Sequence, residues 1–289
     1  MKVMIIGADG QLGTDLVRVF QSETNWEIIP TTIRDFDITQ ADQCERMITT
    51  HSPDVLINTA AYIQVDLCEK ELETAFRVNV FSQKHLTDLC RQNKVRYCLL
   101  STDYVFDGGK GTPYTEEDIP NPANMYGVSK LAGEQVVRYN MDSYFIVRVS
   151  GLYGVAGPMG KRGNFVDTIL ERARKGEPLR VVDDQCLTPT YTLDVAKQLV
   201  SLLSTSHFGL YHITNQGACT WHAFAEEALR QCGLKNEVGK AKTGDFGELA
   251  RRPAYSVLEN KHLQQLGLDQ MPDWKDALHH YLVSKGHIQ

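Results

Sequence analysis

Short apolar runs alternate with longer amphipathic stretches through the first half of the chain. The runs are rich in β-branched residues and end at turn residues, which is typical of strands, whereas the stretches between them repeat apolar positions at helical spacing. The predicted strands are residues 3–6, 27–29, 55–57, 97–100 and 145–149, and the predicted helices are residues 11–20, 41–50, 71–92 and 126–139. Apolar strands that alternate with helices indicate a parallel sheet covered on both faces. The pattern therefore predicts an α/β fold with a Rossmann-like, doubly wound parallel sheet.

The pattern changes after Tyr153, where a glycine-rich loop (residues 154–163) with a basic tip begins. Less regular segments follow it: predicted helices at residues 165–175 and 193–203, and predicted strands at residues 179–183 and 209–214. We expect residues 1–153 to form one domain and residues 154–289 to form mainly a small C-terminal lobe, with some segments returning to the first sheet.

Composition excludes several classes of protein. The net charge of −6 comes without a basic stripe, so we expect no nucleic acid as partner, and no apolar run approaches the roughly 20 residues that cross a bilayer. The chain starts with a strand rather than a signal peptide, and its seven cysteines form no CxxC pair. We expect free thiols in a cytoplasmic protein. The nine histidines show no spacing typical of a metal site, so none is predicted.

The first strand leads into a turn with three glycines, Gly7, Gly10 and Gly13, at the start of the first helix. Glycines let the backbone approach a pyrophosphate, and the helix N-terminus, with Gln11 and Leu12, supplies N–H donors. The spacing GxxGxxG departs from the usual GxGxxG, but its place after the first strand favours nucleotide binding over a simple turn. Residues 1–153 are therefore expected to bind NAD(P).

The choice between NADH and NADPH depends on the end of the second strand. An NAD site usually has an acid there for the ribose 2′-hydroxyl, whereas this chain has Thr31 and, nearby, Arg34, which suits a 2′-phosphate or is an ordinary surface residue. NADPH or NADH is the expected cofactor. Further cofactor contacts are expected near the ends of later strands, although each of these residues could instead have only a structural role. They are Asp37, Ile38, Ala60, Ala61, Tyr62 and, on the following helix, Asn79.

Tyr126 and Lys130 are four residues apart at the start of a predicted helix, so both side chains project from one face. A phenol needs a neighbouring ammonium to lower its pKa for proton transfer to a carbonyl, and the same ammonium can bind ribose hydroxyls. YxxxK alone is a weak signal, but here it follows the predicted nucleotide-binding half. Thr102, at the end of the fourth strand, is expected to bond the carbonyl oxygen or the Tyr126 hydroxyl. The neighbouring Asp103 is expected to hold a substrate hydroxyl, unless both only cap the turn.

These motifs resemble those of the extended short-chain dehydrogenase/reductases that act on nucleotide sugars, most closely the dTDP-4-dehydrorhamnose reductases. The matching strings are GADGQLG, DVLINTAAY, STDYVFDG, YGVSKLAGE, NF at Asn164, DQCLTPT and RRPAYSVL, in one order over nearly the whole chain. The resemblance implies a Rossmann domain with a substrate lobe. It also implies NAD(P)H-dependent reduction of the 4-keto group of dTDP-4-dehydro-L-rhamnose to dTDP-L-rhamnose, for polysaccharide synthesis. Tyr126, Lys130 and Thr102 match the catalytic residues, and the expected sugar contacts are Thr102, Asp103, Tyr104, Gly151 and Asn164.

One position departs from the family. Gly151 stands where the family usually has a tryptophan against the sugar. We expect this glycine to leave one wall of the sugar pocket open. Either the loop with Lys161 and Arg162 closes the pocket, by pairing with the substrate diphosphate, or the substrate is a different one.

Three alternatives differ in their chemistry. A dehydratase would have an acid directly after the Thr-Asp pair, where this chain has Tyr104. A nucleotide-sugar epimerase would use the same Tyr-Lys pair and retain NAD. An NADP-binding regulatory subunit, such as that of methionine adenosyltransferase, would bind cofactor without turnover. The expected partner is a nucleotide-sugar substrate, and a homodimer is possible.

Overall fold

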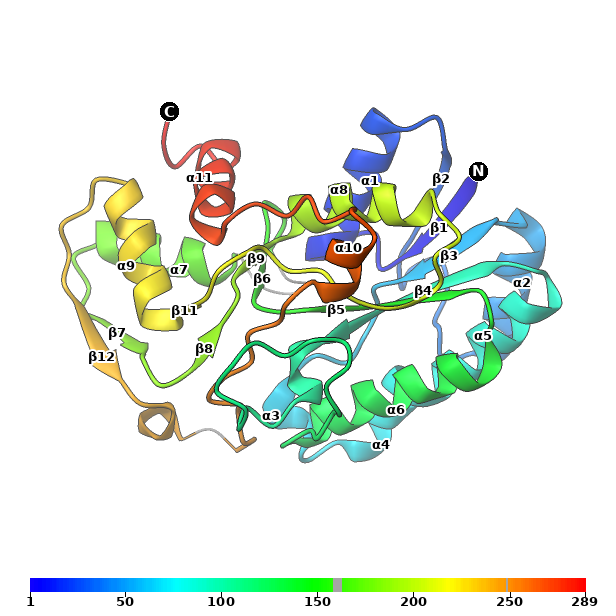
Figure 1. Ribbon diagram of the computed structural model, residues 1–289, viewed down its shortest axis with the longest axis horizontal. Helices are drawn as coiled ribbons and strands as arrows, with labels where there is room; N and C mark the ends of the chain where they lie inside the picture. Colours follow the sequence, from blue (N-terminus) through cyan, green and yellow to red (C-terminus); the bar gives the residue numbers. More distant parts are fainter. Residues whose placement is uncertain (158–162, 248) are drawn as a thin grey trace.

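A six-stranded parallel sheet forms the centre of the computed structural model, which describes residues 1–157, 163–247 and 249–289 (Figure 1). The strand order is β10-β5-β4-β3-β1-β2, and every neighbouring pair is parallel. The strands are β1 (Lys2–Ile6), β2 (Glu27–Thr31), β3 (Val55–Asn58), β4 (Arg96–Thr102), β5 (Tyr144–Val149) and β10 (Gly209–His212). The predicted doubly wound α/β fold is confirmed.

Helices cover both faces of this sheet, and alternate residues of each strand supply the two cores. In β1, Val3 and Ile5 join the core under α1 (Gln11–Glu23) and α8 (Thr192–Leu203), whereas Met4 and Ile6 join the core on the opposite face. Three helices cover that second face: α2 (Ala41–His51), α5 (Ser82–Gln92) and α6 (Met125–Asn140). Figure 1 shows α1 and α8 on one side of the sheet and α5 and α6 on the other.

The helix predicted at residues 71–92 is interrupted in the structure. α4 (Leu72–Phe76) passes into a π-helical turn, η1 (Arg77–Phe81), before α5 begins. π-turns are rare and occur often at functional sites. The short α3 (Val65–Cys68) precedes them.

The second half of the chain both returns to the sheet and builds a lobe of its own. β10 pairs with β5, and α8 packs against α1. A separate core, around Tyr153 and Phe224, unites the helices of the lobe. The helices of the lobe are α7 (Phe165–Arg174), α9 (Trp221–Gln231) and α11 (Trp274–Ser284), and its strands are β6 (Leu152–Tyr153), β7 (Leu179–Val182), β8 (Cys186–Leu187), β9 (Thr190–Tyr191), β11 (Cys219–Thr220) and β12 (Val238–Ala241). Short helices lie in connecting segments: η2 (Asp103–Val105), η3 (Thr243–Phe246) and α10 (Lys261–Gln265).

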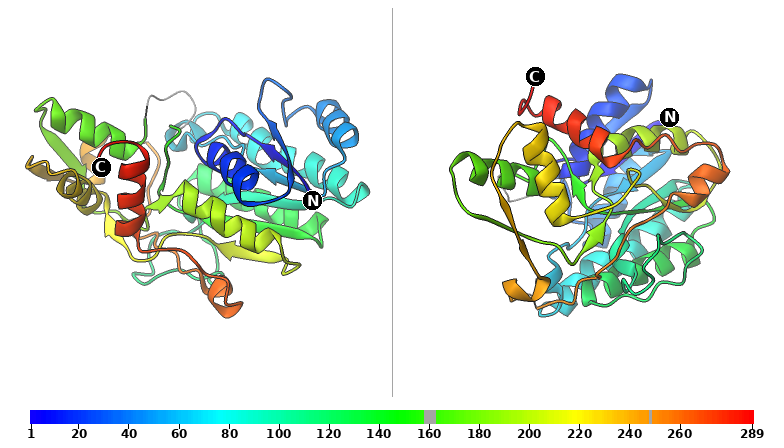
Figure 2. Two further views of the ribbon diagram at one scale, coloured as in Figure 1. Left: turned by 90° about the horizontal axis from the view of Figure 1, so that it is seen from above. Right: turned by 60° about the vertical axis from the view of Figure 1, so that its left-hand side comes forward.

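Both views in Figure 2 place α7 and α9 at the end of the molecule away from β2. All seven cysteines are free thiols, and five of them are buried. In the described part of the chain, no helix is both long and apolar enough to cross a membrane.

Candidate active site

The turn between β1 and α1 has the close backbone packing that its glycines predict. Gly7 adopts a left-handed φ of 78°, and a Cβ there would lie 2.6 Å from Thr59 Oγ1. A Cβ on Gly13 would lie 2.0 Å from the carbonyl oxygen of Gly7, so only glycine lets α1 start so close to the strand. Gly10 is the N-cap and has no side chain to cap the first-turn N–H groups of α1. Those donors and the helix dipole therefore suit an anionic group such as a pyrophosphate.

Thr31 shapes this turn from inside the sheet. Its hydroxyl donates to the carbonyl oxygen of Ile5 at 2.9 Å, its own carbonyl accepts from Gly7 and Ala8 N–H, and it is 2 % exposed. The hydroxyl of Thr31 is thus already bonded within the sheet, and cofactor binding by Thr31 stays a prediction.

An acid that the sequence reasoning missed lies at the end of β2. Asp35 accepts hydrogen bonds from the N–H and the hydroxyl of Thr32, at 2.7 and 3.0 Å, so the turn brings its carboxylate back to the strand end. Arg34 lies beside it and is exposed. An acidic residue three positions after Thr32 is itself a turn signal, and it could have indicated this arrangement.

The other predicted cofactor contacts lie in segments that follow neighbouring strands. Leu12 and Ile38 are buried in the two sheet cores, so they can face a cofactor only through their backbone. Asp37 caps its own loop by accepting from Thr39 N–H. Gln11, the first residue of α1, is partly exposed, and so are Ala60, Ala61 and Tyr62 in the loop after β3.

Asn79 holds the loop after β3 against α6. Its Oδ1 accepts from Tyr62 N–H at 2.8 Å, and its Nδ2 donates to the carbonyl oxygen of Tyr62 and to Ser129 Oγ, at 3.1 and 2.9 Å. Ser129 Oγ in turn donates to the carbonyl oxygen of Tyr126. The π-turn that carries Asn79 thus connects the expected cofactor loop to the expected catalytic helix.

Tyr126 and Lys130 lie on the first two turns of α6, as predicted. Asn124 caps this helix by accepting from Gly127 N–H, and a Cβ on Gly127 would lie 2.1 Å from the carbonyl oxygen of Tyr104. Glycine at this position therefore lets α6 begin against η2. The Lys130 ammonium donates to the carbonyl oxygen of Leu100 at 2.6 Å and is almost fully buried.

The pKa values of this pair are shifted by their surroundings. Burial raises the pKa of Tyr126, a hydrogen bond with Thr102 opposes this shift, and the Asp103 charge adds to it. Burial lowers the pKa of Lys130 to about 8, and the Glu134 charge opposes that shift. A buried lysine whose pKa lies near neutrality is suited to proton transfer.

Thr102 is the last residue of β4, Asp103 follows it, and both lie beside Tyr126. Thr102 caps η2 by accepting from Tyr104 N–H, donates to Asp103 Oδ1 at 3.0 Å, and also hydrogen-bonds Tyr126. The Asp103 carboxylate accepts from three protein hydroxyls, including Ser150 and Ser256, and is 4 % exposed. Its oxygens are therefore occupied within the protein, and the predicted contact with a sugar hydroxyl is not available in this structure.

Asn164, an expected sugar contact, caps a helix of the lobe. Asn164 is the N-cap of α7; its Oδ1 accepts from Asp167 N–H, and its Nδ2 donates to the carbonyl oxygen of Gly154 and to Tyr281 Oη, both at 2.9 Å. Asn164 is 5 % exposed and its amide is fully bonded within the lobe, so the structure gives it the role of a helix cap, and its sugar contact stays a prediction.

The predicted open wall at Gly151 is also wrong. Gly151 has a left-handed φ of 53°, and a Cβ there would lie 2.6 Å from Leu187 Cδ1 and 3.2 Å from the carbonyl oxygen of Thr188. The Leu187 side chain already fills the space beside the glycine. Lys161 and Arg162 lie outside the described residues.

Tyr104, another expected sugar contact, lies directly beside Tyr126. Its ring lies edge-on to that of Tyr126, with centroids 5.7 Å apart, and its hydroxyl accepts from Arg252 Nη1 at 3.5 Å. Arg252 also pairs with Asp66 at 3.3 Å, across the two halves of the chain. Sequence reasoning assigned no role to Arg252, although the string RRPAYSVL contains it.

A pocket of about 380 Å³ lies beside Arg252. Its lining comes from three segments of the second half: Asp184, Thr243, Gly244, Gly247, Leu249, Ala250, Arg251, Arg252 and Ala254. Two arginines in the lining suit a ligand with negative charge, such as the diphosphate of a nucleotide sugar.

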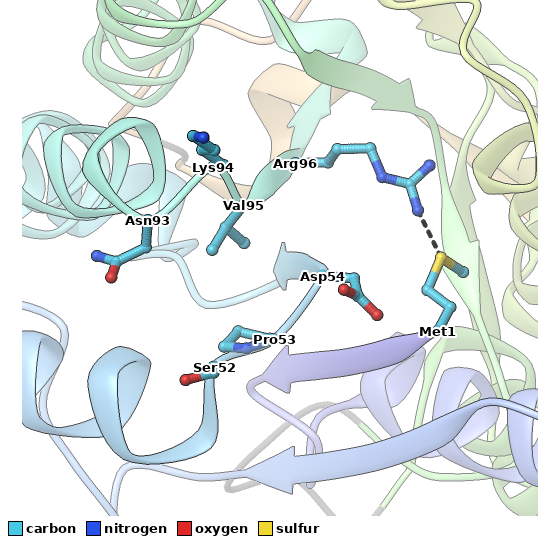
Figure 3. A pocket seen from close by; sticks show the side chains of 8 residues that line it. All are labelled: Met1, Ser52, Pro53, Asp54, Asn93, Lys94, Val95 and Arg96. Atoms are coloured by element: carbon cyan, nitrogen blue, oxygen red, sulfur yellow. Dashed lines mark hydrogen bonds between the residues drawn. The ribbon is translucent and has the colours of Figure 1, made fainter.

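Another pocket, of about 620 Å³, lies at the opposite edge of the sheet (Figure 3). Its lining includes Asp54, before β3, and Arg96, which starts β4, whereas Thr102 and Tyr126 lie at the carboxyl end of β4. The Arg96 guanidinium points to the Met1 sulfur and is hydrogen-bonded to it. Ligands of open α/β sheets bind at the carboxyl ends of the strands, so this pocket is not the active site.

Comparison with known proteins gives matches over nearly the whole chain. Residues 1–286 match the family model described as RmlD substrate binding domain. The spore coat polysaccharide biosynthesis protein SpsK of Bacillus subtilis is 36% identical over 98% of this chain and 98% of its own length. The dTDP-4-dehydrorhamnose reductase of Aggregatibacter actinomycetemcomitans is 35% identical over 96% of this chain and 97% of its own.

A solved structure shows the same fold at similar identity. The dTDP-4-dehydrorhamnose reductase of Bacillus anthracis, crystallised in complex with NADP, is 36% identical and superposes with a TM-score of 0.91. The superposition covers 98% of this chain and 99% of that one.

Proposed function

Because the chain belongs to the RmlD substrate binding domain family, we propose that it reduces the 4-keto group of a dTDP-linked deoxysugar. The substrate that its relatives' names support is dTDP-4-dehydro-L-rhamnose, which gives dTDP-L-rhamnose. One observation carries this proposal. Tyr126, Lys130 and Thr102 lie together at the carboxyl edge of the parallel sheet, the same edge at which the glycine turn follows β1.

The residues present fit a nicotinamide cofactor. α1 begins at Gly10, whose lack of a side chain leaves first-turn N–H donors for a pyrophosphate, and Asn79 fixes the loop beside it. When bound, the cofactor supplies a hydride to the carbonyl carbon of the sugar. NADPH is the proposed reductant, because the relative from Bacillus anthracis was solved with NADP and Arg34 is exposed at the end of β2.

Tyr126 supplies the proton that completes the reduction. Its phenol donates to the carbonyl oxygen while that oxygen becomes a hydroxyl, and the hydrogen bond with Thr102 orients the phenol. The Lys130 ammonium, fixed by the carbonyl oxygen of Leu100, favours the phenolate that remains after transfer. Arg252 and its pocket are placed to hold the negatively charged part of the substrate.

The test is to mix the purified chain with NADPH and dTDP-4-dehydro-L-rhamnose and to follow NADPH absorbance and the sugar product. One NADPH should be consumed for each dTDP-L-rhamnose formed, and a UDP-linked sugar serves as control. Sugar interconversion without consumption of NADPH would indicate an epimerase. NADPH binding without turnover of any nucleotide keto-sugar would indicate a regulatory protein.

A further inference from the structure

A fully buried ion pair joins the catalytic helix α6 to β5. Arg148, on β5, donates through Nε and Nη2 to the two carboxylate oxygens of Glu134, at 2.9 and 2.7 Å. Their side chains are 1% and 0% exposed. Burying two charges costs several kcal/mol of desolvation, and well-packed apolar residues often replace such a pair without loss of stability. The contribution of the pair to folding therefore does not by itself explain its presence.

Several contacts fix the position of the Glu134 carboxylate. Ser101, the register partner of Arg148 on β4, donates to Glu134 Oε1. The Arg148 guanidinium lies 5.2 Å from the centre of the Phe106 ring, which supports it from the other side. Two strands, β4 and β5, thus hold one carboxylate without any contact to solvent.

Glu134 lies four residues after Lys130 on α6, so the two side chains are neighbours on one face of the helix. Lys130 reaches towards the strand, where the carbonyl oxygen of Leu100 binds its ammonium. Burial disfavours the ammonium form of Lys130, and the negative charge of Glu134 favours it. Removal of Glu134 would therefore lower the pKa of Lys130.

The other charged or titratable groups around Lys130 come from the elements that pack on α6 and β4. Arg148, on β5, is neutralised by Glu134 through two hydrogen bonds. Asp103, in η2, accepts from three hydroxyls, and Tyr104 and Tyr126 are phenols. Burial, followed by the charge of Arg148, lowers the pKa of His212 on β10 to about 3, so this imidazole is neutral at physiological pH. Glu134 is thus the anion one helical turn from Lys130.

We propose that Glu134 is a positioning residue of the active site: its carboxylate, held by Arg148 and Ser101, keeps the Lys130 ammonium charged one helical turn away. Arg148 holds this carboxylate in place through two hydrogen bonds in a region without contact to solvent. The inference rests on the proposed function only for its turnover readout, because cofactor binding reports the charge of Lys130 separately.

The test compares the pH dependence of NADPH binding and of kcat/KM for the keto-sugar. Glu134→Gln leaves the Arg148 charge buried and unpaired, so the double variant Glu134→Gln with Arg148→Met is made as well, which removes both charges together. The matched control is Arg138→Gln, which removes an exposed charge one turn further along α6.

In wild type, we expect NADPH binding and kcat/KM to fall at high pH as Lys130 loses its proton. In Glu134→Gln both falls should move to lower pH by about one unit or more, the scale of one buried charge interaction. In the double variant they should move in the same direction by less, because removal of the positive Arg148 charge offsets part of the loss of Glu134. The Arg138→Gln profile should coincide with that of wild type. An alkaline fall that stays unmoved in both readouts, in Glu134→Gln and in the double variant, would overturn the proposal. If wild type reduces no keto-sugar while the NADPH-binding profile still moves, the proposed function fails and the role of Glu134 stands.

Discussion

Tyr126 is the residue on which the proposed chemistry depends most directly. Its hydroxyl hydrogen-bonds Thr102, and its ring lies edge-on to Tyr104. Tyr126→Phe keeps the ring and removes the proton donor, so we expect kcat to fall by roughly 10²-fold or more, the scale of general acid catalysis. NADPH affinity, measured by fluorescence titration, should stay as in wild type. A variant that turns over at a near-normal rate would remove Tyr126 from the mechanism.

The end of β2 presents opposite charges to an incoming cofactor. Arg34 is exposed, while the Asp35 carboxylate is bound by Thr32. We expect NADPH to support reduction at least as well as NADH. Arg34→Ala should raise the KM for NADPH about tenfold, as the loss of a charge-assisted hydrogen bond implies, and leave the KM for NADH unchanged. An equal effect on both cofactors would place Arg34 outside the site.

Gly151 is a position where backbone and packing act together. An alanine there must adopt a left-handed φ and must also displace Leu187. Gly151→Ala should lower the free energy of unfolding by about 2–4 kcal/mol, because strain and overpacking add. Gly233→Ala is the control: φ is 68° there, but a Cβ meets nothing within 4 Å, so only the strain of about 1 kcal/mol applies. Equal losses in urea unfolding would show that Leu187 yields without cost.

At the scale of elements, the π-turn between α4 and α5 connects cofactor loop and catalytic helix through Asn79. Asn79→Ala leaves the N–H and carbonyl of Tyr62 and the Ser129 hydroxyl without this partner. We expect a loss of about 2–3 kcal/mol in the free energy of unfolding together with weaker NADPH binding. Ser129→Ala is the control, since it leaves the Tyr62 loop bound. If it weakens NADPH binding as much as Asn79→Ala does, the loop contact is unimportant.

The spacing of apolar residues predicted the strands of the sheet and most of its helices, because buried positions repeat at a fixed interval in each kind of element. The π-turn has no such signature, because residues 71–92 read as one helix. The partners of its Asn79, Tyr62 and Ser129, are distant in sequence. The same limit explains the site. Tyr126 and Lys130 follow from local spacing, whereas Asn164 looks like a ligand contact in sequence and is a helix cap whose partner, Tyr281, is more than a hundred residues away.

For the whole molecule, the link between the two halves is the least predictable feature. The sequence predicts that segments after residue 154 return to the sheet, and β10 and α8 lie there. The pairing of Asp66 with Arg252, which brings an arginine beside Tyr104, follows only from the folded chain. The division into domains at residue 153 and the homodimer stay predictions. Analytical ultracentrifugation would measure the oligomeric state.

The position of β10 has a consequence for synthesis on the ribosome. β5 is made long before its outer partner, so the emerging chain carries an open, apolar strand edge until residues 209–212 leave the exit tunnel. Such an edge invites pairing with other chains. Stalled nascent chains of increasing length should therefore remain protease-sensitive in the sheet until β10 has emerged, and a fragment of residues 1–153 should aggregate. Full protease protection of that fragment would show that the five earlier strands fold without their last neighbour.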